Sequence, residues 1–212
     1  MMMERSRVFF ILILLAVCTL FAAGCTAPRT SDTHNTTIAI QDYNQWAEAQ
    51  GAYAGQVTTS LAQLGTTIDA YNHDMATGSS DPTVLQGDVA ADGQALGQWG
   101  AANTALGAAT DTFSSDTSSL MFGSDQETPW LAGLLVQDMK IYCISMANAQ
   151  QHFVDYNRDM SSYLSVDNPD YRDDALRMAA MNAKTQGLES LSQGDEALSN
   201  ITATAQLLQQ RQ

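Results

Sequence analysis

The sequence predicts an all-α protein, built as an up-down-up-down bundle of four long helices. Three observations predict this fold. Apolar residues recur at helical rather than alternating spacing from residue 38 onward, proline follows a helix-capping residue at three places, and the segments between the periodic stretches are short. Because short connections make consecutive helices antiparallel, residues 38–212 are expected to form one domain of two hairpins, 38–121 and 128–212.

The first expected helix follows a polar segment. Residues 26–37 lack apolar periodicity and are typical of a flexible tether, so residues 25–37 are expected to lie outside the domain. Beyond them, one apolar face recurs in steps of three, four and their sums, through Tyr43, Trp46, Tyr53, Val57, Leu64, Ile68, Tyr71 and Met75.

The other three helices each begin with the same signal, a residue whose side chain caps a helix followed by proline. A side-chain oxygen accepts a hydrogen bond from a free backbone amide, and proline suits the first helical position. The signal occurs at Asp81-Pro82, Thr128-Pro129 and Asn168-Pro169. Helices are therefore expected to start near residues 82, 129 and 169.

Glycine pairs fall inside the first two helices at four-residue spacing, as Gly51/Gly55 and Gly93/Gly97. Each glycine in a helix interior costs about 1 kcal/mol relative to alanine. Close packing of the two backbones would offset that cost, so the pairs predict an unusually near approach of the first two helices. The alternative is local looseness.

Two nearly identical pentapeptides, YNHDM at residues 71–75 and YNRDM at residues 156–160, lie near the ends of the first and third helices. A helical hairpin duplicated in tandem explains them, with Tyr71 and Tyr156 pointing inward and His73 and Arg158 outward. The alternative is a pair of equivalent sites, formed by the asparagines and aspartates that both copies retain: Asn72, Asn157, Asp74 and Asp159.

The first 24 residues have the features of an export signal. Arg5 and Arg7 precede an apolar run that is shorter than the roughly 20 residues of a membrane-spanning helix and ends in small residues. The stretch FAAGC, which ends at Cys25, resembles the lipobox of prokaryotic lipoproteins. This resemblance covers residues 1–25 only. It implies that the signal peptide 1–24 is removed, that Cys25 receives the lipid, and that the domain is anchored to the cell membrane outside the cytoplasm.

The charge of the chain is strongly acidic, at −14 with histidine neutral. No lysine or arginine occurs between Arg29 and Lys140, an interval that holds 13 acidic residues. Nucleic acid and anionic lipid headgroups are therefore not expected partners. With Cys25 lipidated, Cys143 is the one cysteine left in the mature chain, so no intramolecular disulfide is expected. Asn35 begins a glycosylation sequon, Asn35-Thr36-Thr37.

Catalytic motifs of the common enzyme classes are absent from the sequence, including the nucleophile elbow, the zinc-protease helix, the phosphate-binding loop and the dinucleotide fingerprint. We therefore expect no enzyme and no cofactor. The expected role is a non-catalytic protein-binding or structural module at the cell surface, with a protein partner or a second copy of the chain as its ligand.

An alternative role is the binding of a small ligand or metal ion. Gln50, Asp138 and Asp195 are expected at one level of the bundle, while Asp92 and Asn103 occupy other core positions. A buried polar layer can hold a cation or a protonated carboxylate. It can also serve only to fix the helix register.

The expected contact surface is the end of the bundle farthest from the anchor, where acidic residues gather. The acids in question are Asp74, Asp81, Asp159, Asp167 and Asp174. Concentrated negative charge suits a cationic partner. The alternative is structural, because acids near a helix N-terminus, such as Asp170, Asp173 and Asp174, interact favourably with the helix dipole.

Overall fold

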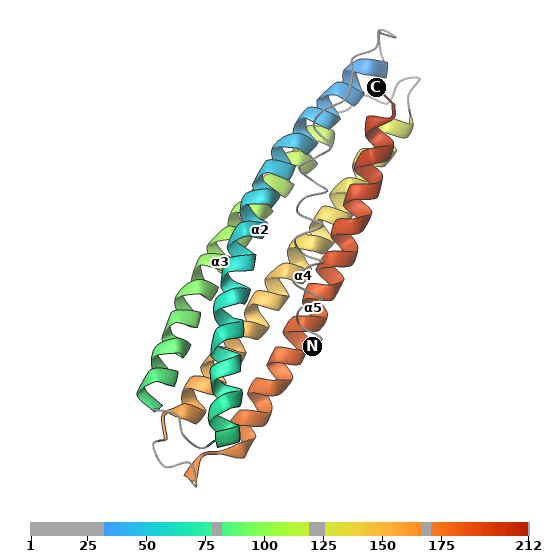
Figure 1. Ribbon diagram of the computed structural model, residues 1–212. Coiled ribbons are helices and arrows are strands. Elements are labelled where there is room, and N and C mark those ends of the chain that lie inside the picture. The colour runs from blue at the N-terminus through green and yellow to red at the C-terminus, as the bar shows by residue number, and fades with distance from the viewer. Residues whose placement is uncertain (1–31, 78–81, 119–125, 167–170, 212) are drawn as a thin grey trace.

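The protein is described by a computed structural model over residues 32–77, 82–118, 126–166 and 171–211. These residues form four α-helices and no strand: α2 (Asp32–Thr77), α3 (Pro82–Ser118), α4 (Glu127–Leu164) and α5 (Asp174–Gln209). The chain reverses direction from each helix to the next (Figure 1). The predicted all-α fold of four long helices is confirmed. The predicted signal peptide, residues 1–24, and Cys25 lie outside the described residues.

The starts of the helices agree only in part with the proline signals. Helix α3 begins at Pro82, as predicted. Helix α4 begins at Glu127, with Gln126 in the capping position, so the prediction that Thr128 is the cap is wrong. The Thr128 hydroxyl is instead buried and lies 3.1 Å from the Thr36 hydroxyl of α2. A contact between two helices replaces the local cap.

Helix α5 begins at Asp174, beyond the predicted start near residue 169. The Asp173 side chain is its cap, accepting a hydrogen bond from the Ala175 amide at 2.8 Å. Before the helix, Arg172 Nε donates to the Val166 carbonyl oxygen at 3.0 Å. Asn168 and Asp170 lie outside the described residues.

Helix α2 begins at Asp32, so residues 32–37 are helical and the prediction of a flexible tether over them is wrong. The reason is that the core extends to this end of the bundle. Thr36 and Ala39 are buried, and Thr36 bonds to α4. Asn35 therefore lies in a helix, although its side chain is not described.

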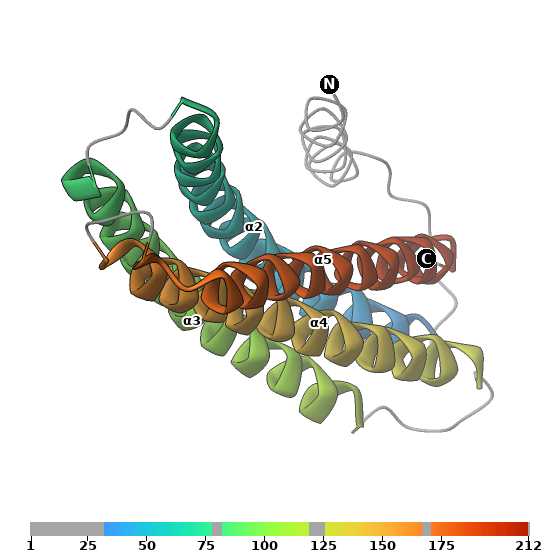
Figure 2. The ribbon, with the colours of Figure 1, turned by 90° about the horizontal axis from the view of Figure 1, so that it is seen from below.

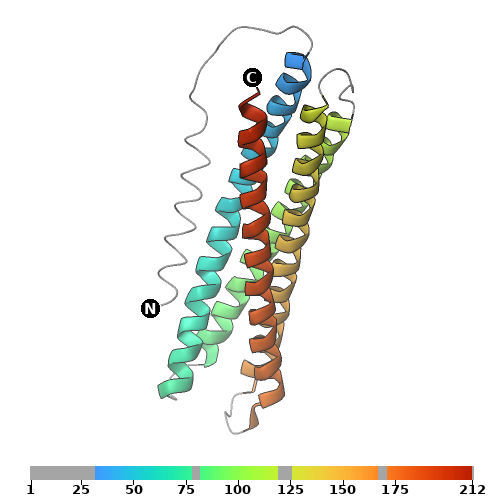
Figure 3. The same ribbon diagram turned by 90° about the vertical axis from the view of Figure 1, so that its right-hand side faces the viewer.

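The helices pack most extensively as the pair α4/α5, followed by α2/α3 and α3/α4, whereas α2 touches α5 and α4 at few points. Figures 2 and 3 show α4 and α5 running side by side, with α2 separating from α5 toward the end where α2 terminates. The largest buried side chains lie along the whole bundle: Trp99, Tyr71, Tyr156, Phe113 and Phe153. The apolar row predicted for the first helix, from Tyr43 to Tyr71, lies in this core.

Glycine permits close packing in α5 rather than between α2 and α3. A Cβ atom on Gly187 would lie 3.0 Å from the Phe153 ring, and one on Gly194 would lie 2.6 Å from the Met146 sulfur, both on α4. In contrast, a Cβ on Gly51, Gly55 or Gly97 would have no neighbour within 4 Å. The predicted near approach of α2 and α3 at these pairs is wrong, because these three glycines meet no other helix and a Cβ on Gly93 would lie 3.3 Å from the Asn157 amide of α4, not from α2.

Candidate functional site

The predicted polar layer is only partly assembled. Gln50 is buried, and its Nε2 donates a long hydrogen bond of 3.5 Å to the Tyr142 hydroxyl. Burial raises the pKa of the Asp195 carboxyl to about 6. Burial also raises the pKa of Tyr142, and the nearby charge of Asp195 adds to the effect. Gln50, Tyr142 and Asp195 therefore share one region of the interior.

Asp138 does not join this layer through any hydrogen bond or ion pair with the described residues. It is half-buried, and burial raises the pKa of its carboxyl. Within the described part of the chain, no three His, Cys, Asp or Glu residues gather in a way that could hold a metal ion. The sequence did not single out Tyr142, although a core aromatic with a polar tip requires a partner when it is buried.

A second polar layer links α2 to α3 through aromatic side chains. The Tyr53 hydroxyl donates to Asn103 Oδ1 at 2.7 Å and accepts from Trp99 Nε1 at 2.7 Å. Nearby, Trp46 Nε1 donates to the Thr110 hydroxyl at 2.9 Å. Asn103 was predicted at a core position, and its role here is to satisfy the Tyr53 hydroxyl. These groups satisfy one another, as a layer that fixes helix register requires.

Cys143 adjoins this layer. Its sulfur lies 3.3 Å from the Thr110 hydroxyl. Burial raises the pKa of the Cys143 thiol, and the hydrogen bond between Cys143 and Thr110 only partly opposes that effect. A thiol whose pKa is raised carries little thiolate, the nucleophilic form, so this cysteine has a packing role.

The third polar group is centred on Asp92, which is 1% exposed. Its Oδ1 accepts from the Thr67 hydroxyl at 2.9 Å, whereas its Oδ2 is buried without a partner. The hydroxyl of Tyr156 and Oδ1 of Asn157 are buried and unpartnered as well. Burial raises the pKa of Asp92 to about 6, against the lowering effect of the Thr67 hydrogen bond.

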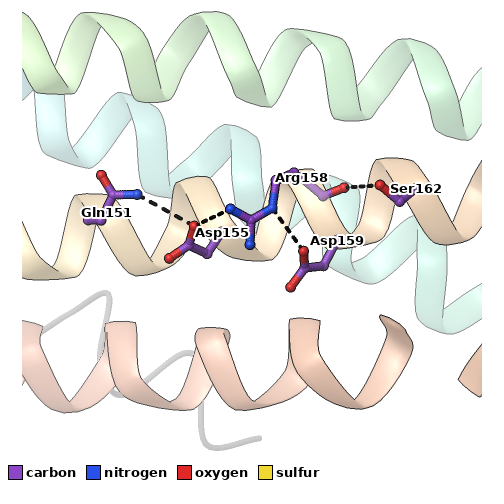
Figure 4. Close-up of polar contacts among 5 residues, drawn as sticks. All are labelled: Gln151, Asp155, Arg158, Asp159 and Ser162. Carbon is purple, nitrogen blue, oxygen red and sulfur yellow. Dashed lines mark hydrogen bonds and ion pairs between the residues drawn. The ribbon is translucent and has the colours of Figure 1, made fainter. Parts of the chain in front are cut away.

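The acidic end of the bundle is partly neutralised within the protein. Arg158 Nη1 lies 2.8 Å from Asp155 and its Nε lies 3.0 Å from Asp159, as Figure 4 shows. Arg177 Nε lies 3.1 Å from Asp174. Two of the five acids predicted to form the contact surface thus have arginine partners. Of the others, Asp81 and Asp167 lie outside the described residues, and so does the side chain of Asp74.

A row of residues on the outer face of α4 was not recognised in the sequence. This α4 outer row comprises Trp130, Leu134, Gln137, Ile141, Ile144 and Asn148, separated by alternating steps of four and three residues. Trp130 is 59% exposed and Ile144 is 62% exposed, while Leu134 is half-buried. The available signal was a second apolar row at helical spacing beside the core row.

The surface around the α4 outer row carries no exposed acid. Among the exposed α4 residues from position 130 to position 151, Lys140 is the one charged side chain. The same face becomes charged beyond Gln151, whose Nε2 donates to Asp155 at 3.5 Å, at one end of the network drawn in Figure 4. The face is therefore divided into an apolar half near the start of α4 and a charged half near its end.

Comparisons of the chain with protein-family models, with curated proteins and with solved structures returned no match. None of the helices in the described part of the chain is both long enough and apolar enough to cross a membrane.

Proposed function

We propose that this protein is a lipid-anchored bundle outside the cytoplasm, which binds a protein partner and catalyses no reaction. The α4 outer row carries the proposal. Large apolar side chains that gather on one exposed face are typical of surfaces that bind another protein. Here they gather on a face of α4 without a fully exposed acid, in a chain whose net charge is −14. The half-buried Asp138 is the one carboxylate beside the row that a partner would meet.

The position of the row suits a chain attached through Cys25. Helix α2 begins, and α5 ends, at the end of the bundle where α4 starts, since Thr36 contacts Thr128 and Arg211 pairs with Glu127. A lipid on Cys25 would hold this end at the membrane. The row then starts at the membrane with Trp130 and extends outward along α4.

The internal polar groups support a non-catalytic role. Tyr53, Trp99 and Asn103 satisfy one another, and the Cys143 thiol is kept protonated by burial. A general acid, base or nucleophile has to reach a substrate. These groups instead bond within the core.

The anchor is tested by expressing the full chain and its Cys25→Ser variant in a lipoprotein-processing host. The full chain is expected to enter the detergent phase, and the variant to remain in the aqueous phase. Equal partitioning of the two chains would contradict the anchor.

The interaction surface is tested by placing a photoreactive amino acid at Gln137, with Gln193 on α5 as the matched exposed control. Irradiation of cells is expected to give a discrete polypeptide adduct from position 137 and none from position 193. Adducts of equal yield from the two positions would show non-specific contact and reject the row as the interface.

A second candidate function is the binding of a small ligand or metal ion by Gln50, Asp138 and Asp195. The observation that favours it is the half-buried Asp195 beside Gln50 and Tyr142, in a bundle whose α2 and α5 touch little. Native mass spectrometry of the mature domain tests it, because a retained ligand adds mass. If neither the native domain nor its Asp195→Asn variant carried mass beyond that of the polypeptide, this function would be rejected.

A further inference from the structure

We propose that the α4 outer row is the seam of a parallel homodimer, so that the protein partner of the proposed function is a second copy of this chain. This inference rests on the proposed function, because it identifies the partner and uses the anchor to set the orientation. Its starting point is the spacing of the row. Steps of four and three residues are the spacing of the a and d positions in a coiled coil, in which two helices pack side by side.

The row fits this pattern at six successive positions. Leu134, Ile141 and Asn148 occupy the a positions, and Trp130, Gln137 and Ile144 occupy the d positions. The core residues of α4 lie on the opposite face. Leu135 and Tyr142, one residue after two of the a positions, are buried against the rest of the bundle. Helix α4 therefore carries two separate packing faces, and among the described residues only the inner one is covered by other helices.

The charge of the chain limits where a second copy can dock. Two chains of net charge −14 repel each other, and the repulsion is largest where acids face acids. Helices α2 and α3 carry exposed acids, such as Glu48 and Asp111, and α5 exposes Glu189 and Glu196. The α4 outer row exposes none. A copy that docks through the row brings together two surfaces that are mainly apolar or amide, flanked by the exposed Lys140 and the half-buried Asp138.

The two ends of the row define the length of the seam. At the far end, Asp155 and Arg158 satisfy each other within the chain at 2.8 Å, so a copy gains little by reaching them. The seam from Trp130 to Asn148 is then about 27 Å long at 1.5 Å of rise per residue. A contact of that length is modest. Confinement to one membrane raises the effective concentration of the copies and compensates for it.

The parallel orientation follows from the anchor and from Asn148. Two copies attached to one membrane through Cys25 have their α4 helices pointing the same way. In that arrangement the two Asn148 side chains meet across the seam. A single asparagine at an a position of a coiled coil selects one register, because any shift leaves its amide without a partner.

The test is disulfide cross-linking of the full chain in membranes. In a parallel, in-register dimer the two Gln137 positions face each other at short Cβ separation, which is the geometry a disulfide requires. Gln137→Cys is expected to give a covalent dimer on mild oxidation. Gln193→Cys, an equally solvent-exposed position on α5, is the control and is expected to give none. Native Cys143 is present in both variants, so any background from it is common to them.

A second substitution shows whether the row itself holds the dimer. Adding Ile144→Asp to Gln137→Cys is expected to abolish the cross-link, whereas adding Leu188→Asp, at an exposed leucine of α5, is expected to leave it unchanged. Circular dichroism of the variants checks that the bundle remains helical. The proposal is overturned if Gln137→Cys cross-links no more than Gln193→Cys, or if the cross-link persists with Ile144→Asp.

The remaining outcomes separate the dimer from the proposed function. A disulfide from position 137 to a different polypeptide would overturn the homodimer and leave protein binding by the row intact. Failure of the full chain to enter the detergent phase would remove the anchor, and with it the argument for parallel orientation. A cross-link that is nevertheless formed at position 137 in that case would still establish the dimer.

Discussion

Tyr71 of α2 lies beside Tyr163 of α4, with ring centroids 6.2 Å apart in an edge-to-face arrangement. Two α2–α4 hydrogen bonds join residues at the same separation of 92 positions, between Thr36 and Thr128 and between Gln50 and Tyr142. The two pentapeptide copies are 85 positions apart. Tyr163 is the α4 residue at the level of Tyr71, and Tyr156 precedes it by seven residues. Tyr156 therefore lies about 10 Å from the level of Tyr71 along the bundle. Offset copies do not form a matched pair of sites at one end.

Both tyrosines of the pentapeptides are predicted to be structural. Tyr71 is 2% exposed and Tyr156 is 1% exposed, whereas His73 and Arg158 are exposed. Truncating a buried aromatic to alanine costs about 3 to 5 kcal/mol, whereas exposed substitutions stay within about 0.5 kcal/mol. Urea unfolding of Tyr71→Ala and Tyr156→Ala should show large losses of stability, with His73→Ala and Arg158→Ala near wild type. Small, equal losses in all four variants would contradict the inward-facing assignment.

Glycine substitutions are predicted to have opposite effects in α5 and α3. Gly187→Ala places a methyl group 3.0 Å from the rigid Phe153 ring, and such overpacking costs about 1 to 3 kcal/mol. Gly97→Ala meets no atom within 4 Å and gains helix propensity, worth about 1 kcal/mol. Thermal unfolding should show a lower midpoint for the first variant and a higher one for the second. A rise in both midpoints would mean that α4 and α5 are not closely packed at Gly187.

Asp92 is predicted to make stability depend on pH. Its pKa is about 6 in the folded protein, above the ordinary value of 3.8, because it is buried. A carboxyl with a raised folded pKa binds its proton more tightly when folded, so its contribution favours folding below about pH 4 and is lost as pH rises through about 6. The rise corresponds to at most about 3 kcal/mol.

The variant Asp92→Asn removes this titration. The free energy of unfolding of the variant minus that of wild type should be larger at pH 8 than at pH 4. Most of this change should occur between pH 4 and pH 6. Denaturant unfolding across this range measures the difference. Asp111→Asn, at an exposed position of the same helix, is the control. A stability difference between Asp92→Asn and wild type that does not change with pH would show that Asp92 is not buried as a carboxylate.

Sequence patterns predicted the helices and most of the core because helical periodicity is a local property. It identified the inward faces of Tyr53, Val57 and Tyr71, and Pro82 marked the start of α3. The other helix starts depended on competing hydrogen bonds, which include contacts with residues far away in the sequence. Thr128 could cap α4 or bond to α2, and Asn168 competed with Asp173 at the start of α5. Local sequence does not rank such alternatives.

The polar layer was predicted at the correct level of the bundle but not in its membership. Helix rise places Gln50 and Asp195 at similar heights, and the structure brings both near Tyr142. Rotation about the helix axis decides the rest. Helix α4 packs closely on α5 at Gly187 and Gly194, and Asp138 is half-buried on α4 without a hydrogen bond or ion pair to the described residues of the layer. Glycine contacts of this kind become evident only when the partner helix is known.

The Tyr53 hydroxyl is predicted to matter more for stability than the other tyrosine hydroxyl in the same half of α2. It donates to Asn103 and accepts from Trp99, each at 2.7 Å, inside the core. Tyr53→Phe would leave Trp99 Nε1 buried without a hydrogen bond, at a cost of about 1 to 3 kcal/mol, and would remove a partner from the half-buried Asn103. Tyr43→Phe is the matched control, because Tyr43 is only half-buried and stacks on Trp46 through its ring.

Denaturant unfolding of the two variants measures the difference. Tyr53→Phe should lose stability clearly, and Tyr43→Phe should stay close to wild type, since phenylalanine keeps the stacked ring. Trp99 fluorescence should also change in Tyr53→Phe, because its indole nitrogen loses an acceptor. If the two variants were equally stable, a water molecule or a rearranged amide would have to satisfy Trp99 and Asn103. The layer would then not fix the register of α2 against α3.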